Sequence, residues 1–337
     1  MIPVTVVTGF LGSGKTTLLR RALSDPRFAA TALIVNEFGE IGFDDALVQA
    51  STDTLIQLST GCLCCRIRSD LVTTLLDLEA RRADGSVPPY ARVVIETSGL
   101  ADPAPILHAL MTDGGVAEGH RLAGLVTTVD ASTGSPTLDR HVEARRQVAL
   151  ADRIVVTKTD IAPDSEPLRT RVAGINPIAS LTVGDRGAVS PDWLLVGDEG
   201  ASHTLDLSRW IATSRVDFEG PLGHARHSDG IETFTIVRED PVPAVALTLF
   251  LQALAEHGGA DLLRLKGLAC IAESPETPAA VHGVQHVFHP PEWLEAWPTE
   301  DHRTRLVIIG RGIPRAWPGR LLDVLVEEVR RASRSRR

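Results

Sequence analysis

The sequence lacks the features that mark membrane, secreted and repetitive proteins. None of its apolar runs approaches the roughly 20 residues that a membrane-spanning helix requires, and no charged leader precedes the first strand pattern. It contains no internal repeat and no low-complexity tract. We therefore expect a globular, cytoplasmic protein that does not engage a membrane.

Positive charge is also in deficit. Lys and Arg number 34 against 43 Asp and Glu, which gives a formal net charge of -9. A general binder of nucleic-acid backbones needs a basic face to neutralise phosphates, so we expect no nucleic-acid partner. The Arg-rich end, residues 330–337, is a local exception that we interpret as a solvated tail.

Cysteine is scarce and unevenly distributed. Three of the four cysteines fall within four positions, at Cys62, Cys64 and Cys65, whereas Cys270 stands apart. In a reducing compartment such crowding indicates metal or redox chemistry rather than structural disulfides.

What is present suits two folded domains, because 337 residues exceed one ordinary core and 43% of them are hydrophobic. In residues 1–205, short Val/Ile/Leu runs typical of buried parallel strands alternate with helical patterns. The expected strands are 4–8, 32–35, 93–96, 125–129 and 154–157, and the expected helices are 16–23, 70–80, 103–109 and 138–150. This alternation predicts an α/β domain in which helices cover both faces of a mostly parallel sheet.

The pattern changes in the second half of the chain. Residues 206–229 are rich in Gly, Asp, Ser and His and form the predicted linker. In residues 230–333 the expected strands are 231–237, 262–271, 284–288 and 305–309, and the expected helices are 245–257 and 321–330. Their order predicts a smaller α+β domain with an antiparallel sheet.

A phosphate-binding loop follows the first expected strand, in the sequence Gly-Phe-Leu-Gly-Ser-Gly-Lys-Thr-Thr at residues 9–17. Glycines let backbone amides converge on phosphate oxygens, and the next helix directs its positive end there. Lys15 is expected to meet the β- and γ-phosphates, and the Thr16 hydroxyl to coordinate Mg²⁺. The alternative is a glycine-rich turn that fits by chance. The expected nucleotide contacts of the loop are Gly9, Gly12, Ser13, Gly14, Lys15, Thr16 and Thr17.

A second motif, Thr157-Lys158-Thr159-Asp160, follows a later strand and favours GTP. The Asp160 carboxylate can accept from both guanine N1–H and the N2 amino group, whereas adenine offers no such pair of donors. Lys158 would pack its stem over the base or brace the phosphate loop. The alternative is that Asp160 caps a helix.

A third motif, Glu96-Thr97-Ser98-Gly99, suits the γ-phosphate side of the site. Glu96 would hold a Mg²⁺-bound water or orient the attacking one, and we assign it and Lys15 to catalysis. The Gly99 amide would contact the γ-phosphate. The alternative is that Glu96 caps the helix that follows Pro103.

Together these motifs resemble those of the CobW-type metal-handling GTPases, which include cobalamin-pathway CobW proteins, YjiA-like proteins and nitrile hydratase activators. The resemblance covers nearly the whole chain. It rests on residues 9–17, Asn-Glu-Phe-Gly-Glu at 36–40, Gly-Cys-Leu-Cys-Cys at 61–65, 96–103 and 157–160, and more loosely on 263–267 and 282–285.

The cysteine cluster is the expected metal site. Cys62, Cys64 and Cys65 converge if their loop turns, and soft thiolates favour Zn²⁺ or another transition metal, such as Co²⁺, over Mg²⁺. Glu37, a histidine, water or a ligand from a partner would fill the fourth position. Buried structural cysteines and a redox pair are the alternatives. We assign no second metal site to His282, His286 and His289, because the strand-like pattern around them scatters side chains over both faces.

We interpret the chain as a GTP-hydrolysing metallochaperone that binds GTP and GDP and delivers metal to a client apo-metalloprotein. The cysteines lie between two segments expected near the γ-phosphate, so one rearrangement can affect both sites. No arginine finger is identifiable, so a partner or a second copy in a homodimer would complete the site. The alternatives are a metal-sensing regulatory binder without metal transfer and a P-loop kinase, against which residues 157–160 argue.

Overall fold

A computed structural model of the chain describes residues 1–35, 55–57, 66–184, 189–190, 193–194 and 230–335. The chain divides into two compact units, Met1–Ala173 with Ala179–His203, and Gly174–Ile178 with Thr204–Arg337. The predicted linker, residues 206–229, lies outside the described residues. The bounds 1–205 and 230–333 of the two domains therefore remain a prediction.

The first unit contains a seven-stranded sheet in which every pair of neighbouring strands is parallel. Its strand order, β3-β2-β4-β1-β5-β6-β7, places β1 at the centre. Val4, Val6 and Val7 of β1 are fully buried because helices cover both faces of the sheet. The strands are β1 (Ile2–Gly9), β2 (Thr31–Val35), β3 (Leu55–Gln57), β4 (Arg92–Glu96), β5 (His120–Asp130), β6 (Arg153–Thr157) and β7 (Ser180–Val183).

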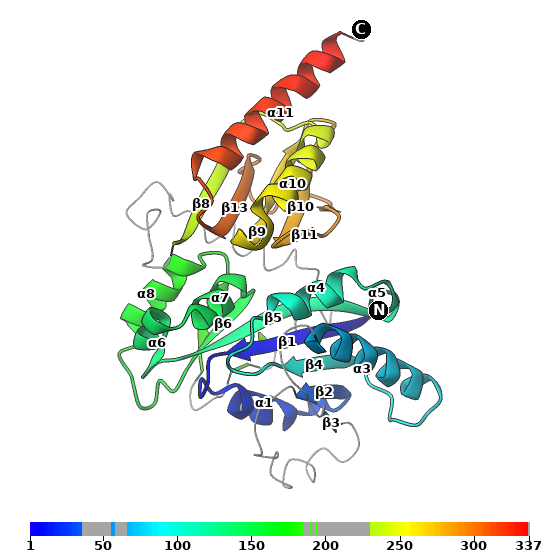
Figure 1. Ribbon diagram of the computed structural model, residues 1–337, viewed down its shortest axis with the longest axis vertical. Coiled ribbons are helices and arrows are strands. Elements are labelled where there is room, and N and C mark those ends of the chain that lie inside the picture. Colours follow the sequence, from blue (N-terminus) through cyan, green and yellow to red (C-terminus); the bar gives the residue numbers. More distant parts are fainter. Residues whose placement is uncertain (36–54, 58–65, 185–188, 191–192, 195–229, 336–337) are drawn as a thin grey trace. The chain divides into compact units, whose positions relative to one another are not determined.

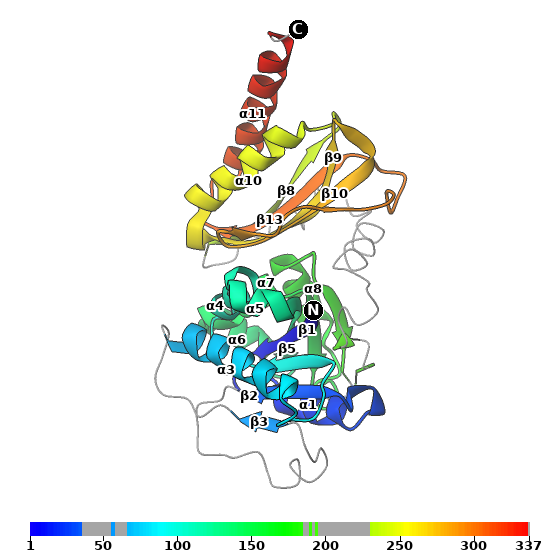
Figure 2. The same cartoon turned by 90° about the vertical axis from the view of Figure 1, so that its right-hand side faces the viewer.

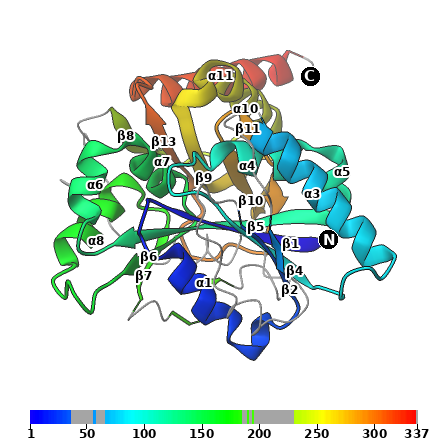
Figure 3. The same ribbon diagram turned by 60° about the horizontal axis from the view of Figure 1, so that its bottom comes forward.

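Helices lie on both faces of this sheet, as predicted. On one face α1 (Lys15–Leu23) packs Leu18 and Leu19 against a core that includes Val7 and Val126. On the other lie α4 (Ala104–Thr112), α5 (Gly114–Gly119) and α7 (Val142–Leu150) (Figure 1). Figure 3 shows the same separation, with α3 (Arg66–Ala83) beside α4. The other helices in the described residues of this unit are η1 (Pro26–Phe28), α6 (Gly134–Arg140) and α8 (Glu166–Ile175).

One predicted helix, residues 138–150, is in fact two. The helical conformation is interrupted at His141, whose backbone is extended (φ -120°, ψ 116°) between α6 and α7. The His141 ring lies 4.4 Å, centroid to centroid, from the Phe10 ring of the glycine-rich loop. The break thus brings the start of α7 to that loop, a tertiary contact that a helical pattern in the sequence does not reveal. The short strands β3 and β7 were also not predicted.

The second unit is an α+β domain, as predicted. Its six-stranded sheet follows the order β11-β10-β9-β13-β8, with β12 paired to β10, and the pairs are antiparallel. Figure 2 shows α10 and α11 on one face of this sheet, where Phe250 and Leu254 are fully buried. The elements are β8 (Ile231–Arg238), α10 (Ala244–Gly258), η4 (Gly259–Asp261), β9 (Leu262–Ile271), β10 (Ser274–Val284), β11 (Val287–Phe288), β12 (Glu292–Trp293), β13 (Thr304–Arg311) and α11 (Ala316–Arg334).

The prediction of a strand over residues 284–288 was wrong. Strand β10 already ends at Val284, and a turn at Gln285, with a left-handed φ of 51°, leads into β11. The apolar residues on either side of this turn gave the impression of one strand. His282 is buried in β10, His286 lies in the turn and His289 follows β11, so the three histidines do not share one strand.

No helix in the part of the chain that the structure describes combines the length and apolar character needed to cross a membrane.

Candidate nucleotide site

Four strands of the first unit end at one edge of the sheet, and each contributes its last residue to the candidate site. These residues are Gly9 of β1, Glu96 of β4, Asp130 of β5 and Thr157 of β6. The strands are parallel neighbours, with Val7 opposite Glu96 and Asp130 opposite Thr157. Ligands of open α/β sheets bind beyond this edge, so the topology assembles motifs that are far apart in the sequence.

The glycine-rich loop has the backbone of an anion cradle. Gly9 and Gly14 have φ values of 144° and 93°, which side chains rarely allow. A Cβ on Gly9 would also clash with Thr128 of β5. Gly14 immediately precedes α1, so the unsatisfied N–H groups of the first turn point toward the loop. The predicted glycine-rich sequence therefore forms a loop suited to phosphate oxygens.

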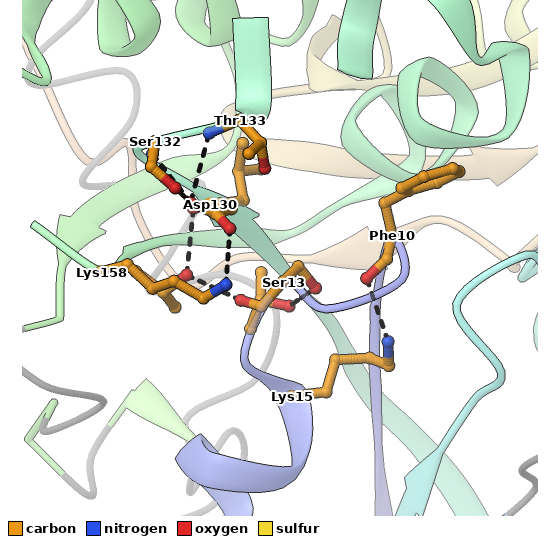
Figure 4. Close-up of polar contacts among 10 residues, drawn as sticks. Phe10, Ser13, Lys15, Asp130, Ser132, Thr133 and Lys158 are labelled. Atoms are coloured by element: carbon orange, nitrogen blue, oxygen red, sulfur yellow. Dashed lines mark hydrogen bonds and ion pairs between the residues drawn. The ribbon is translucent and has the colours of Figure 1, made fainter. Parts of the chain in front are cut away.

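Lys15 folds back over this loop. Its Nζ donates a hydrogen bond to the carbonyl oxygen of Gly9 at 2.8 Å. It also donates to the carbonyl oxygen of Phe10 at 3.2 Å (Figure 4). The side chain is 7% exposed, and a buried ammonium is stable only when its donors are satisfied. The fold thus holds a buried positive charge against the predicted phosphate cradle.

Thr16 and Glu96 meet beside the loop. The Thr16 hydroxyl donates to Glu96 Oε1 at 2.7 Å, and Glu96 is only 1% exposed. A hydroxyl and a carboxylate side by side are hard oxygen donors of the kind that Mg²⁺ prefers, so these residues fit that ion. The alternative role of Glu96 as a helix cap is taken by another acid, because Asp102 Oδ1 accepts from the Ala104 N–H at the start of α4.

The Glu96-Thr97-Ser98-Gly99 motif lies against the phosphate loop. The Thr97 N–H donates to Val7 O at 2.9 Å, and the Thr97 and Thr8 hydroxyls lie 2.7 Å apart. Gly99 approaches Leu11 so closely that a Cβ on Gly99 would lie 2.6 Å from the Leu11 nitrogen. The predicted γ-phosphate segment and the phosphate loop are therefore direct neighbours.

The later Thr157-Lys158-Thr159-Asp160 motif is tied to the phosphate loop through Thr157. Its hydroxyl donates to Ser13 O at 2.7 Å, and the Ser13 hydroxyl lies 2.6 Å from the Thr128 hydroxyl of β5. All three side chains are buried. The predicted base-binding and phosphate-binding segments are thus joined by hydrogen bonds within one body.

Asp130 holds Lys158. Lys158 has a left-handed φ of 58°, and its Nζ lies 2.7 Å from Asp130 Oδ2 (Figure 4). Asp130 also accepts from the backbone N–H and hydroxyl of Ser132, at 2.7 and 2.6 Å, and from the Thr133 N–H. Burial raises the pKa of Asp130, but the hydrogen bonds from Lys158 and Ser132 outweigh it and leave the pKa below its usual value. The carboxylate therefore stays charged and anchors the lysine.

Asp160 lies in an exposed turn after β6. Helix α8 begins only at Glu166, so Asp160 does not cap it, and the helix-cap alternative is wrong. An exposed carboxylate beyond the end of β6 is accessible to a base.

The predicted metal ligands Cys62, Cys64, Cys65 and Glu37 lie outside the described residues. Within the ranges that the structure covers, no three His, Cys, Asp or Glu side chains gather as they would around a metal ion. Cys270 is buried in β9, where burial and then the charge of Glu276 raise the pKa of its thiol. That environment disfavours the thiolate that metals bind.

Two family models match this chain. The one described as CobW/HypB/UreG, nucleotide-binding domain, matches residues 3–182, and the one described as cobalamin synthesis protein cobW C-terminal domain matches residues 231–325. The chain belongs to the CobW/HypB/UreG family.

Several similar proteins have names that refer to zinc or to metalloproteins. The zinc chaperone YjiA of Escherichia coli K12 is 32% identical over 93% of this chain and 95% of its own. The zinc-regulated GTPase metalloprotein activator 1 of Saccharomyces cerevisiae is 32% identical, over 53% of this chain and 47% of its own. The solved structure of Zn(II)-bound E. coli YjiA GTPase matches with a TM-score of 0.72 and 26% identity, over 96% of this chain and 98% of that one.

In this CobW/HypB/UreG chain, the described residues of the three predicted nucleotide motifs converge on one edge of the sheet. Two polar residues at this edge, Asp130 and Gln147, were not predicted from the sequence. Asp130 could have been found, because it ends a buried strand just as Glu96 does. Gln147 of α7, which is 1% exposed and contacts the turn around Gly99, carries no local sequence signal.

Proposed function

We propose that this chain is a GTP-hydrolysing metallochaperone that binds zinc at Cys62, Cys64 and Cys65 and couples its nucleotide state to delivery of the metal to a client apoprotein. The observation that carries the proposal is the convergence of the phosphate loop, Glu96 and the Thr157–Asp160 motif at the carboxyl edge of one sheet. Relatives named zinc chaperones and zinc-regulated GTPases support the metal and the nucleotide.

The nucleotide lies across this edge in the proposal. Amides of the phosphate loop and Lys15 bind the phosphates, Asp160 accepts from guanine, and the Lys158 stem covers the base. The Asp130–Lys158 ion pair supports this role because it fixes the lysine before the nucleotide arrives.

Hydrolysis adds a water molecule across the bond between the γ-phosphorus and the bridging oxygen. The water oxygen bonds to phosphorus, the bridging oxygen leaves with GDP, and phosphate and a proton are released. Glu96 orients the attacking water or holds a metal-bound one, and Lys15 stabilises the negative charge on the β- and γ-oxygens. Mg²⁺, held by the Thr16 hydroxyl, would neutralise phosphate charge when bound.

Zinc is the cargo in this proposal. Thiolates of Cys62, Cys64 and Cys65 bind it, with Glu37 as a fourth ligand that can be displaced. The cysteines lie in sequence between Glu37 and the Glu96 segment, so a change at the γ-phosphate can reach the metal. Loss of the γ-phosphate would then weaken zinc binding and release the ion to the client.

The test measures zinc affinity by competition with a chelator in nucleotide-free, GDP-bound and non-hydrolysable-GTP-bound protein at fixed pH. We expect the GTP analogue to tighten zinc binding by about 5- to 150-fold, and zinc to tighten binding of the analogue by the same factor. Cys64→Ser is the control, because it removes a thiolate but no proposed nucleotide contact. Equal zinc affinity in the three states would refute nucleotide-gated delivery.

A further inference from the structure

Helix α7 holds the turn that carries Gly99. The side-chain amide of Gln147, Nε2, donates to Gly99 O at 3.1 Å and to Ala101 O at 3.0 Å. Gln147 is 1% exposed, and its own backbone carbonyl accepts from the Thr127 hydroxyl of β5 at 2.9 Å. One buried side chain, anchored to the sheet, therefore fixes two carbonyl groups of the turn.

The turn itself is compact. The Ala101 N–H donates to Ser98 O at 3.0 Å, and Gly99 lies against the Leu11 backbone of the phosphate loop. A second residue of α7, Arg146, pairs with Asp102 at 2.9 Å just beyond the turn. The turn thus lies between the phosphate loop and α7, with the Gly99 and Ala101 carbonyls on the α7 side.

This arrangement determines which way an amide of the turn points. The described residues contain no cis peptide bond, and in a trans peptide the N–H points opposite to the C=O. Because Gly99 O is directed at Gln147, the N–H of Leu100, in the same peptide unit, is directed away from α7. A backbone donor whose direction is fixed before the ligand arrives binds an anion without reorganisation.

We propose that Gln147 is a positioning residue for the γ-phosphate: it orients the Ser98–Ala101 turn so that the Leu100 N–H meets the γ-phosphate of bound GTP. The inference rests on the proposed GTP-binding function and names a residue that acts through the turn, without touching the nucleotide. GDP lacks the group that the turn would contact, so the role is specific to the triphosphate.

The two hydrogen bonds that Nε2 donates hold the side-chain amide of Gln147 in place. Its other amide atom, Oε1, is buried and finds no hydrogen-bond partner within the described structure. A buried acceptor without a partner is unfavourable, so the two hydrogen bonds from Nε2 are what dictate the orientation of the amide. Gln147, Phe10 and Leu11 line the same small pocket, which places the amide next to the phosphate loop.

The test compares nucleotide affinities of two variants. Gln147→Glu nearly preserves size but removes both donors and puts a carboxylate against two carbonyls, whereas Gln147→Met removes the donors without adding charge. We expect each to weaken binding of a non-hydrolysable GTP analogue by about 10-fold or more, because both hydrogen bonds that hold the turn are lost. GDP affinity should change by less than about 2-fold, and kcat should fall with the analogue affinity. Glu143→Gln on the same helix is the matched control.

The outcomes separate this inference from the function on which it rests. Failure of the parent protein to bind guanine nucleotides would overturn the proposed function itself. If the parent binds them, but the Gln147 variants weaken GDP and the analogue equally, or weaken neither, the positioning role is refuted. Thermal unfolding of all variants identifies those that are folded, and Gln147→Met decides the question if Gln147→Glu does not fold.

Discussion

Substitution of Gly99 by alanine tests the contact between the turn and the phosphate loop. The new Cβ would lie 2.6 Å from the nitrogen and 2.8 Å from the Cα of Leu11, whereas ordinary contacts of a Cβ begin at 3.4 Å. Both Leu11 atoms belong to the backbone, so a change of side-chain rotamer cannot relieve the clash at them. The turn and the loop must therefore move apart by about 0.6–0.8 Å.

The size of the kinetic effect follows from this displacement. A misplacement of about 1 Å can reduce catalysis about 100-fold, so we expect Gly99→Ala to lower kcat/KM for GTP by roughly 10- to 100-fold. That corresponds to about 1.4–2.7 kcal/mol of transition-state stabilisation. The backbone of Gly99 is not in the left-handed region, so the alanine meets no φ penalty and the protein should remain folded.

The assay is steady-state phosphate release over a range of GTP concentrations, with thermal unfolding to confirm the fold. Gly114→Ala is the matched control, because a Cβ on Gly114, at the start of α5, meets no atom within 4 Å. Hydrolysis by folded Gly99→Ala at the parental rate would show that the spacing of the turn and the loop does not matter, and would refute the reasoning.

Three further predictions concern single side chains. Lys15→Ala should abolish GTP hydrolysis at saturating GTP, measured as phosphate release, because it removes the charge held against the loop; near-normal turnover would contradict that role. Asp160→Asn should weaken GTP binding and shift preference toward xanthine nucleotides in calorimetry, and unchanged GTP affinity would exclude Asp160 from base recognition. Asp301→Asn should lower the free energy of unfolding near neutral pH by about 1 kcal/mol. Hydrogen bonds from Arg303 and the charge of Arg305 lower the pKa of Asp301 to about 2. The free energy equivalent to this pKa shift is reduced by about half, because the Asp301 side chain is 33% exposed and solvent screens its ion pairs. A depressed pKa stabilises the fold above about pH 4 and ceases to do so as the pH falls through 2. The difference in unfolding free energy between parent and variant, measured by denaturant unfolding, should therefore vanish toward pH 2. A pH-independent difference would show that the charge of Asp301 does not stabilise the fold.

The local sequence determined the elements whose chemistry lies within a few consecutive residues. Buried Val/Ile/Leu runs specified the five longer strands of the first sheet, because a strand covered on both faces needs apolar residues at every position. The phosphate loop was equally clear, since its glycines and Lys15 act within one short segment. The antiparallel second domain followed from the changed order of strands and helices.

Only the tertiary structure decided which side chains act together. The contacts Thr16 to Glu96, Ser13 to Thr157 and Lys158 to Asp130 arise because parallel strands end at one edge, and their spacing along the chain gives no sign of it. The break at His141 and the turn at Gln285 were likewise missed, because an extended residue and a left-handed residue interrupt patterns that continue in the sequence. Gln147 shows the same limit most plainly: its amide faces two carbonyls of a turn that comes far earlier in the chain, and a glutamine in a helix carries no mark of such a partner until the fold brings the two together.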